Sequence, residues 1–211
     1  MSGPLQPYPV HDPLDAEEAK IALRRAIRSA RETRSERRRT EAARMFADVV
    51  LTIPEVIGAQ CVGLYASRLH EPGTIPLMEE LRALDKRILL PVLGAGLQRN
   101  WAEYAGPEDL LQRAPGRPPE PSTPSLGPEA LELADVVIAP ALAVDSSGNR
   151  LGQGGGWYDR ALAHTRPGVK VIALVFPEEI YDAAVRPLPQ QAHDRPVHGV
   201  ATPHEWYLLT A

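Results

Sequence analysis

Residues 148–160 of the sequence, Gly-Asn-Arg-Leu-Gly-Gln-Gly-Gly-Gly-Trp-Tyr-Asp-Arg, combine the residue types that bind phosphate. Clustered glycines let a backbone approach a ligand closely and adopt dihedral angles that are closed to other residues. An apolar run at 136–139 comes before them and a helix-compatible run at 158–164 follows. The order strand, glycine-rich turn and helix directs unpaired backbone N–H groups towards an anion. Arg150 and Arg160 could add charge-assisted contacts to phosphate.

Asp159, in the same segment, does not suit a bare phosphate, because two negative groups repel each other. A carboxylate beside a phosphate site therefore indicates a bound Mg²⁺, which prefers oxygen ligands and bridges to phosphate oxygens. The glycine spacing matches neither the Gly-x-x-x-x-Gly-Lys-Ser/Thr loop nor the dinucleotide-binding fingerprint. A flexible surface turn is the alternative, but the flanking Trp, Tyr, Asp and Arg residues favour a binding site.

The pattern Arg-Leu-Gly-x-Gly-x-Gly-aromatic-Tyr-Asp at 150–159 resembles the signature of the 5-formyltetrahydrofolate cyclo-ligases, also called 5,10-methenyltetrahydrofolate synthetases. The resemblance covers about residues 18–202. It implies ATP-dependent cyclisation of 5-formyltetrahydrofolate to 5,10-methenyltetrahydrofolate, with release of ADP and phosphate through a phosphorylated formyl intermediate. It also implies a three-layer α/β/α fold related to the ribose-phosphate isomerase and CoA-transferase type.

The resemblance assigns ATP as co-substrate and places its phosphates on the first helix and the glycine loop. A Lys-x-x-x-Arg pair on that helix corresponds to Lys20 and Arg24, which are neighbours on one helix face. Lys20 and Arg150 would be the catalytic cations, because phosphoryl transfer depends on positioning and charge neutralisation. The implied ATP site comprises Lys20, Arg24, Arg150, Leu151, Gly152, Gln153, Gly154, Gly155, Gly156, Trp157 and Tyr158.

The resemblance also assigns three acids. Glu71, in the loop after a predicted strand, would bind the folate by accepting hydrogen bonds from the amide-like N–H groups of the pterin. Asp159 and Asp194 would hold Mg²⁺. The implied folate site comprises Glu71, Gln153, Gly154, Gly155, Gly156 and Trp157. The chain departs from the family pattern at Glu178 and Glu179, where a glutamine is usual, and at Trp157, where a smaller aromatic is usual.

The elements that position these residues alternate between helix and strand. Helices are expected at 15–31, 35–51, 74–84 and 158–164, and strands at 60–66, 87–93, 97–104, 135–140, 169–176 and 198–202. Asp15, Ser35 and Thr74 are expected to cap the first three helices. Short apolar strands between helices predict an α/β protein with a mainly parallel sheet covered on both faces. The proline-dense residues 105–128 are expected to form a long loop, either a lid or plain surface.

Length and charge narrow the class of protein. The 211 residues suffice for one domain, expected at 15–211 after a loose tail at 1–14. A net charge of −4 argues against a general nucleic-acid binder, and most arginines between Arg25 and Arg39 are expected to be solvated. The single cysteine, Cys61, cannot form an internal disulfide, which suits a cytoplasmic protein. No apolar stretch is long enough to span a membrane.

The expected partners are the folate substrate and MgATP, with no nucleic acid or membrane, and the chain is expected to be a monomer or weak homodimer. Two alternatives remain open. One is an ATP-dependent ligase or kinase for another small molecule, and the other is a nucleotide- or folate-binding module without turnover. The presence of Lys20, Glu71 and Asp159 favours the enzyme over the module.

Overall fold

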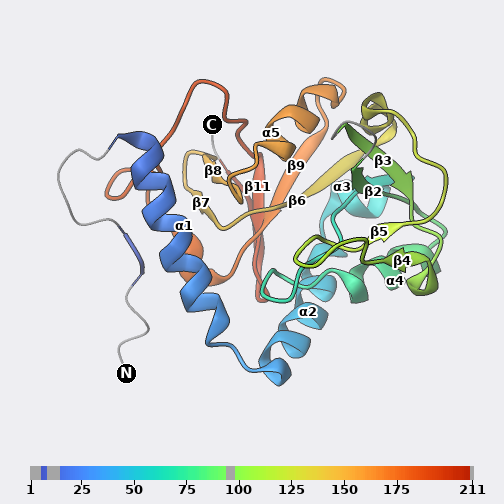
Figure 1. Ribbon diagram of the computed structural model, residues 1–211, viewed down its shortest axis with the longest axis horizontal. Coiled ribbons are helices and arrows are strands. Elements are labelled where there is room, and N and C mark those ends of the chain that lie inside the picture. The colour runs from blue at the N-terminus through green and yellow to red at the C-terminus, as the bar shows by residue number, and fades with distance from the viewer. Residues whose placement is uncertain (1–5, 9–14, 94–97, 210–211) are drawn as a thin grey trace.

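A computed structural model describes residues 6–8, 15–93 and 98–209 (Figure 1). Its α-helices are α1 (Ala16–Glu32), α2 (Glu36–Val50), α3 (Pro54–Gly58), α4 (Ile75–Ala83) and α5 (Trp157–Ala161), and its 3₁₀ turns are η2 (Pro107–Asp109), η3 (Pro128–Leu133), η4 (Leu162–His164) and η5 (Pro177–Glu179). Its strands are β1 (Cys61–Gly63), β2 (Arg87–Leu93), β3 (Arg99–Glu103), β4 (Leu110–Leu111), β5 (Glu120–Pro121), β6 (Val136–Pro140), β7 (Ala143–Asp145), β8 (Arg150–Leu151), β9 (Lys170–Leu174), β10 (Ile180–Tyr181), β11 (Gly199–Ala201) and β12 (Trp206–Leu208).

The central sheet has the strand order β12-β11-β9-β6-β1-β2-β3. All neighbouring strands from β11 to β2 in this order run parallel, whereas β12 and β3 are antiparallel at the two edges. The predicted mainly parallel sheet is therefore confirmed. Loops that leave the carboxyl ends of such strands form the ligand-binding edge of an open α/β sheet.

Alternate residues of the central strands point into two separate apolar cores. Ile138 and Ile172 face α2 and α4, while Val137 and Val171 face η3, α5 and η4. This alternation is the pattern of a sheet buried on both faces, and it produces the expected layers of helix, sheet and helix. The relation to the ribose-phosphate isomerase and CoA-transferase type remains a prediction.

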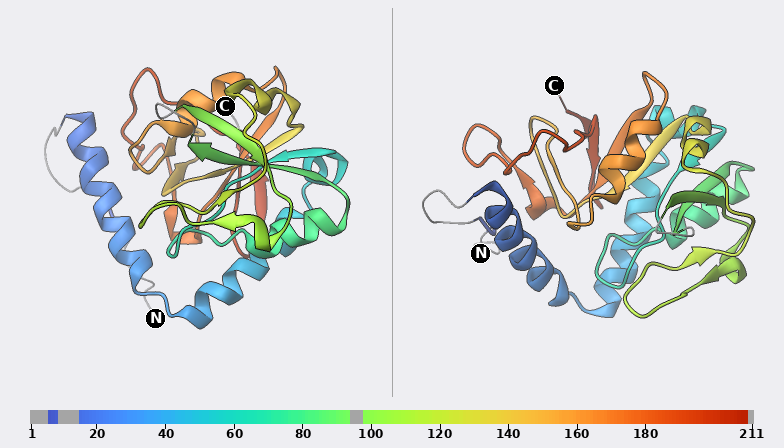
Figure 2. Two further views of the ribbon diagram at one scale, coloured as in Figure 1. Left: turned by 45° about the vertical axis from the view of Figure 1, so that its right-hand side comes forward. Right: turned by 45° about the horizontal axis from the view of Figure 1, so that its top comes forward.

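A smaller sheet, with the order β10-β7-β8, lies beside the central one and supports α1. Leu23 and Ile27 of α1 pack against Ala143, Leu151 and Tyr181 in a third apolar cluster. In Figures 1 and 2, α1 lies along one side of the molecule next to β7 and β8, rather than over a face of the central sheet. The small sheet therefore packs against α1 and also contains the start of the glycine loop, so it determines how far apart these two elements lie.

The predicted helix caps have mixed outcomes. The hydroxyl of Ser35 accepts a hydrogen bond from the backbone N–H of Arg38, as expected for a cap. Asp15 and Thr74 occupy the expected N-cap positions, but neither side chain bonds to its helix. The buried hydroxyl of Thr74 instead donates to the carbonyl of Tyr65 at 2.7 Å, so it secures the loop that follows β1.

Residues 6–8 of the expected loose tail contact the rest of the protein. The side-chain amide of Gln6 donates to the carbonyl of Ile180 at 2.6 Å, and the Tyr8 hydroxyl donates to the carbonyl of Pro187 at 3.1 Å. The remainder of the expected tail, 1–5 and 9–14, lies outside the described residues. No helix in the described ranges is long and apolar enough to cross a membrane. Cys61 is buried, and this burial raises the pKa of its thiol to about 11.

The expectation of solvated arginines is wrong for Arg31. Its side chain is only 2% exposed and donates to both carboxylate oxygens of Glu179 at 2.7 Å, and to the carbonyl of Ala141. Arg34 pairs in turn with Glu178, and its guanidinium lies 3.6 Å from the ring centre of Phe176. Burying a guanidinium is costly unless a bidentate carboxylate offsets the lost hydration, and Glu179 provides that partner.

Candidate active site

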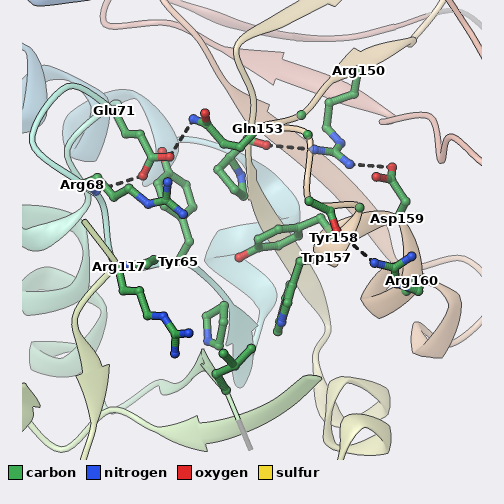
Figure 3. Close-up of a pocket in the computed structure, with 18 of the residues that line it drawn as sticks. Tyr65, Arg68, Glu71, Arg117, Arg150, Gln153, Trp157, Tyr158, Asp159 and Arg160 are labelled. Atoms are coloured by element: carbon green, nitrogen blue, oxygen red, sulfur yellow. Dashed lines mark hydrogen bonds and ion pairs between the residues drawn. The ribbon is translucent and has the colours of Figure 1, made fainter. Parts of the chain in front are cut away.

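A cavity of about 490 Å³ opens at the carboxyl ends of β1 and β6. Its walls come from α1, the loop after β1, the glycine loop, the proline-rich residues 117–120 and the segment 191–194. Figure 3 shows side chains of the loop after β1, of residue Arg117 and of the glycine loop around this space. Residues 117–120, within the predicted long loop, therefore form part of the cavity wall.

The glycine loop joins β8 to α5. Gly154 and Gly156 have φ angles of 103° and 57°, a region that favours glycine, so the loop needs glycine at both positions. Within the described ranges, no residue accepts a hydrogen bond from the backbone N–H of Gln153, Gly154 or Gly155. The α5 helix has only five residues, so its macrodipole contributes less than the sequence suggested. The loop amides themselves, rather than a helix dipole, are therefore the groups that could donate hydrogen bonds to an anion.

Lys20 and Arg24 lie on one face of α1, as their spacing predicts, and both line the cavity. Lys20 is 3% exposed, and its ammonium donates to Asp194 Oδ2 at 2.5 Å and to Gln191 Oε1 at 3.1 Å. Arg24 donates through Nε to the carbonyl of Gly152 at 3.1 Å. The two cations are therefore held by the segment around Asp194 and by the glycine loop, which belong to the carboxyl-terminal half of the chain.

Arg150 is buried at the base of the glycine loop. Its Nη2 atom donates to Asp159 Oδ1 at 2.7 Å, and its Nη1 atom donates to the carbonyl of Pro140 at 3.2 Å. Arg160, the other arginine of the motif, donates to the carbonyl of Gly155 at 2.9 Å. Each arginine thus supports the loop, and Figure 3 shows both at the same end of the cavity as Asp159.

Asp159 and Asp194 both line the cavity although they are 35 positions apart in the sequence (194 minus 159). The backbone N–H of Arg195 donates to Asp159 Oδ1 at 3.3 Å, which brings the residue after Asp194 against Asp159. Partial burial alone would raise the pKa of Asp194. Hydrogen bonds from Lys20 and from the Gln191 N–H outweigh the burial and hold that pKa below its usual value, so the carboxylate is ionised.

Glu71 lies across the cavity from Asp159 (Figure 3). Its Oε2 atom accepts a hydrogen bond from the backbone N–H of Arg68 at 2.9 Å, and its Oε1 atom accepts one from Gln153 Nε2 at 2.8 Å. Each carboxylate oxygen has capacity for a second donor. Glu71 is therefore oriented by the protein and still able to accept hydrogen bonds from a ligand.

Aromatic rings form the floor of the cavity between Glu71 and Asp159. Burial raises the pKa of both Tyr65 and Tyr158 well above the usual tyrosine value, so both hydroxyls stay protonated. Trp157 lines the cavity and also packs edge-on against Trp101 of β3, with ring centres 5.1 Å apart. Trp157 can therefore pack against β3 and also contact a ligand in the cavity.

Residues 16–203 match the family model of the 5-formyltetrahydrofolate cyclo-ligase family. The chain belongs to this family. The family predicted from the pattern at 150–159 is thereby confirmed.

Two bacterial relatives and one bacterial structure show how similar this member of the cyclo-ligase family is to known proteins. A 5-formyltetrahydrofolate cyclo-ligase of Mycolicibacterium smegmatis is 40% identical over 152 residues, covering 70% of this chain and 75% of the relative. One from Escherichia coli is 31% identical over 186 residues, covering 85% and 100%. The structure of Aquifex aeolicus 5,10-methenyltetrahydrofolate synthetase superposes with a TM-score of 0.75 at 26% identity, covering 91% of this chain and 93% of that one.

Several wall residues of this cyclo-ligase were not anticipated from the sequence. They are Tyr65, Arg68, Arg117 and Gln191. Tyr65 and Arg68 carried a usable signal, because they follow β1 on the carboxyl side of a predicted parallel strand. Arg117 and Gln191 lie in irregular segments, where no periodicity shows which side chains face inwards.

Proposed function

We propose that this chain converts 5-formyltetrahydrofolate and ATP into 5,10-methenyltetrahydrofolate, ADP and phosphate. Membership of the cyclo-ligase family supports the folate reaction. One arrangement within the cavity supports the ATP-dependent course. Lys20, Arg24 and the free amides of the glycine loop face the same space as Glu71 and the aromatic floor. A phosphate-binding wall and a wall suited to a flat heterocycle therefore share one cavity.

In the proposed reaction, the formyl oxygen attacks the γ-phosphorus of ATP and ADP leaves with the electrons of the broken bond. The lone pair of the folate N10 then attacks the formyl carbon, and the N10 proton is lost. Phosphate departs with the former formyl oxygen, which balances the atoms. The protein supplies no covalent nucleophile, and its work is to position the reactants and to neutralise developing charge.

Each cation proposed to bind phosphate already has a carboxylate partner, and that of Arg24 is Glu17 on the same helix. Lys20 pairs with Asp194, and Arg150 pairs with Asp159. When phosphate shares these two cations, the two carboxylates lack positive charge, which a divalent cation would supply. Each carboxylate uses one oxygen in its ion pair, so one oxygen of each remains for a hard ion such as Mg²⁺.

The residues therefore fit Mg²⁺ held by Asp159 and Asp194 together with phosphate oxygens and water. No group of three or more His, Cys, Asp or Glu side chains suited to a metal occurs in the described ranges. Magnesium bound with a nucleotide is usually held by one or two protein carboxylates, and phosphate oxygens and water supply the other ligands. The ion would neutralise charge on the phosphates during transfer.

The decisive experiment is turnover by the purified protein. With 5-formyltetrahydrofolate and MgATP, the absorbance of methenyltetrahydrofolate should rise, and one phosphate should appear for each product formed. The signal should be absent without ATP and strongly reduced when EDTA removes the metal. Product formation without ATP would contradict the proposed course, and no product at all would contradict the proposed function.

Two substitutions should separate the two walls of the cavity. Lys20→Ala should raise the KM for ATP more than that for the folate, because its proposed partner is phosphate. Glu71→Gln should raise the folate KM more, since losing a hydrogen bond to a charged acceptor costs about 1.5–3 kcal/mol. Arg25→Ala, an exposed change on the same helix as Lys20, is the matched control. Equal effects of Lys20→Ala on the two KM values would contradict phosphate binding by Lys20 and indicate a purely structural role.

A further inference from the structure

Gln153 of the glycine loop bridges two parts of the cavity that the sequence analysis treated separately. On one side, Arg28 of α1 donates through Nη2 to the backbone carbonyl of Gln153 at 2.7 Å. The same guanidinium donates to the side-chain Oε1 at 3.0 Å from Nη2 and 3.2 Å from Nε. On the other side, Gln153 Nε2 donates to Glu71 Oε1 at 2.8 Å, as Figure 3 shows.

The direction of the Gln153 amide follows from these two neighbours. A guanidinium can only donate hydrogen bonds, and an ionised carboxylate can only accept them. The amide must therefore present its oxygen to Arg28 and its NH₂ group to Glu71. The opposite orientation would set NH₂ against the guanidinium and the amide oxygen against the carboxylate. It would lose the three hydrogen bonds of the side-chain amide and place like partial charges together.

We propose that Arg28 is a positioning residue that fixes the Gln153 amide and thereby couples nucleotide binding on the glycine loop to folate binding at Glu71. This rests on the proposed function, because it requires that both ligands occupy the cavity. The Lys-x-x-x-Arg pattern that identified Lys20 and Arg24 does not include Arg28, which lies one helical turn further along α1. That residue was consequently counted among the solvated arginines.

The position of Arg28 on α1 gives the coupling its route. Lys20, Arg24 and Arg28 follow one another at intervals of four residues, so they lie along one face of a single rigid helix. Arg24 holds the carbonyl of Gly152 and Arg28 holds that of Gln153, so consecutive residues of the loop are anchored to α1. A nucleotide bound to the loop amides would fix this stretch and, through Gln153, would fix Glu71 in its binding orientation.

Charge around Arg28 agrees with a positioning role. Partial burial lowers the pKa of Arg28, and repulsion from Arg24 and Arg68 lowers it further. Glu71 offsets part of this effect, and Gln153 gives the guanidinium two oxygen acceptors, its backbone carbonyl and its Oε1 atom. Arg28 remains an exposed residue, so the fold does not depend on burying its side chain. Its replacement should therefore change the site without unfolding the chain.

The coupling is measured as the change in folate affinity that a nucleotide produces. In the unmodified chain, a non-hydrolysable ATP analogue with Mg²⁺ should tighten 5-formyltetrahydrofolate binding at least about fivefold, and the folate should tighten the analogue equally. In Arg28→Met, the folate affinity should be nearly the same with and without the analogue. Arg25→Met, an equally exposed change on the same helix, should keep the coupling. Loss of coupling in both variants, or in neither, would overturn the proposal.

A second variant tests the other half of the bridge. Gln153→Glu keeps an acceptor for Arg28 but replaces the donor to Glu71 with a like charge. Folate affinity should fall at least about tenfold, while affinity for the nucleotide analogue should change much less. An unchanged folate affinity in this variant would overturn the role given to Gln153.

One readout needs no ligand, so it separates this inference from the proposed function. In the free protein, the ¹⁵N signal of the Gln153 side-chain amide should mark a hydrogen-bonded NH₂ group. That signal should shift towards the value of a solvated glutamine in Arg28→Met and remain in Arg25→Met. An unaltered signal in Arg28→Met would overturn the positioning role. Failure of the free chain to bind folate or ATP, with the expected signal change, would instead overturn the proposed function.

Discussion

The central sheet and α1 are attached to the rest of the protein in different ways. Around the sheet, fully buried apolar side chains such as Phe46, Leu77 and Met78 provide the contacts. On α1, only Leu23 and Ile27 play that part. The remaining contacts are polar, and every one reaches a residue between positions 141 and 194.

This difference indicates that the central sheet has a structural role, whereas the polar side chains of α1 belong to the candidate site. Apolar packing has no partner to exchange, so the sheet keeps its geometry whatever binds above it. A charged side chain held by a carboxylate or carbonyl can transfer to a ligand that offers an equivalent acceptor. Under the proposed function, Lys20 and Arg24 would exchange their present acceptors for phosphate in this way. Arg31 does not line the cavity with them and keeps α1 in place.

The largest effect is expected where a polar contact of α1 is deeply buried. Arg31→Met should lower the free energy of unfolding by about 3–5 kcal/mol, because Glu179 is left as an unpaired buried charge. The double substitution Arg31→Met and Glu179→Met should recover most of this loss. Urea unfolding measures the free energy of unfolding of the single and the double variant. Met78→Ala in the central core, expected to cost about 2–5 kcal/mol, serves as the reference for a cavity with no partner to remove.

A loss below about 1 kcal/mol in Arg31→Met would mean that α1 is attached mainly by its apolar residues, and the contrast between the two regions would disappear.

A medium effect is expected where the two regions meet, at Trp157. Its ring packs on Trp101 of the central sheet and borders the cavity. Trp157→Ala should weaken ligand binding by about 1–3 kcal/mol if a heteroaromatic ring stacks there, whereas Trp157→Phe should keep most of the affinity. Titration calorimetry with folate and with nucleotide identifies the stacked ligand. Equal affinities in all three proteins would leave Trp157 with packing alone.

The smallest effect is expected at the two helix starts. Ser35→Ala should destabilise the protein by about 0.5–1 kcal/mol, because Ser35 caps α2. Asp15→Ala should change stability much less, since the Asp15 side chain makes no capping hydrogen bond to α1. Thermal unfolding compares the two variants. A larger loss for Asp15→Ala would show that α1 depends on its own cap more than on its distant partners.

Local signals in the sequence predicted most of the fold. The apolar run at 169–176 and the cap at Ser35 are read from adjacent residues, and the structure contains the strand and the cap. The very short strands β7, β8 and β10 were not foreseen, because two or three residues show no periodicity. The final strand β12 was missed for the same reason.

The candidate site was predicted only as far as single motifs extend. The glycine loop and the Lys20–Arg24 pair could be found because each is compact in sequence. The partners of those residues could not, since nothing near Lys20 indicates Gln191, and nothing near Arg31 indicates Glu179. Such pairs arise from tertiary approach, and the hydrogen bonds between Arg28 and Gln153, 125 positions apart, could not be read from the sequence for the same reason.

The pairing of the first helix with the last third of the chain also bears on how the protein is made. Lys20 and Asp194 are 174 positions apart, as are Gln6 and Ile180. On a ribosome, α1 is synthesised long before its partners. Contacts of such long range form slowly, because a large loop must close before any stabilisation is gained. A nascent chain therefore cannot fix Lys20 and Arg24 in place until the segment around Asp194 has been synthesised, and the proposed ATP binding should appear only after that point.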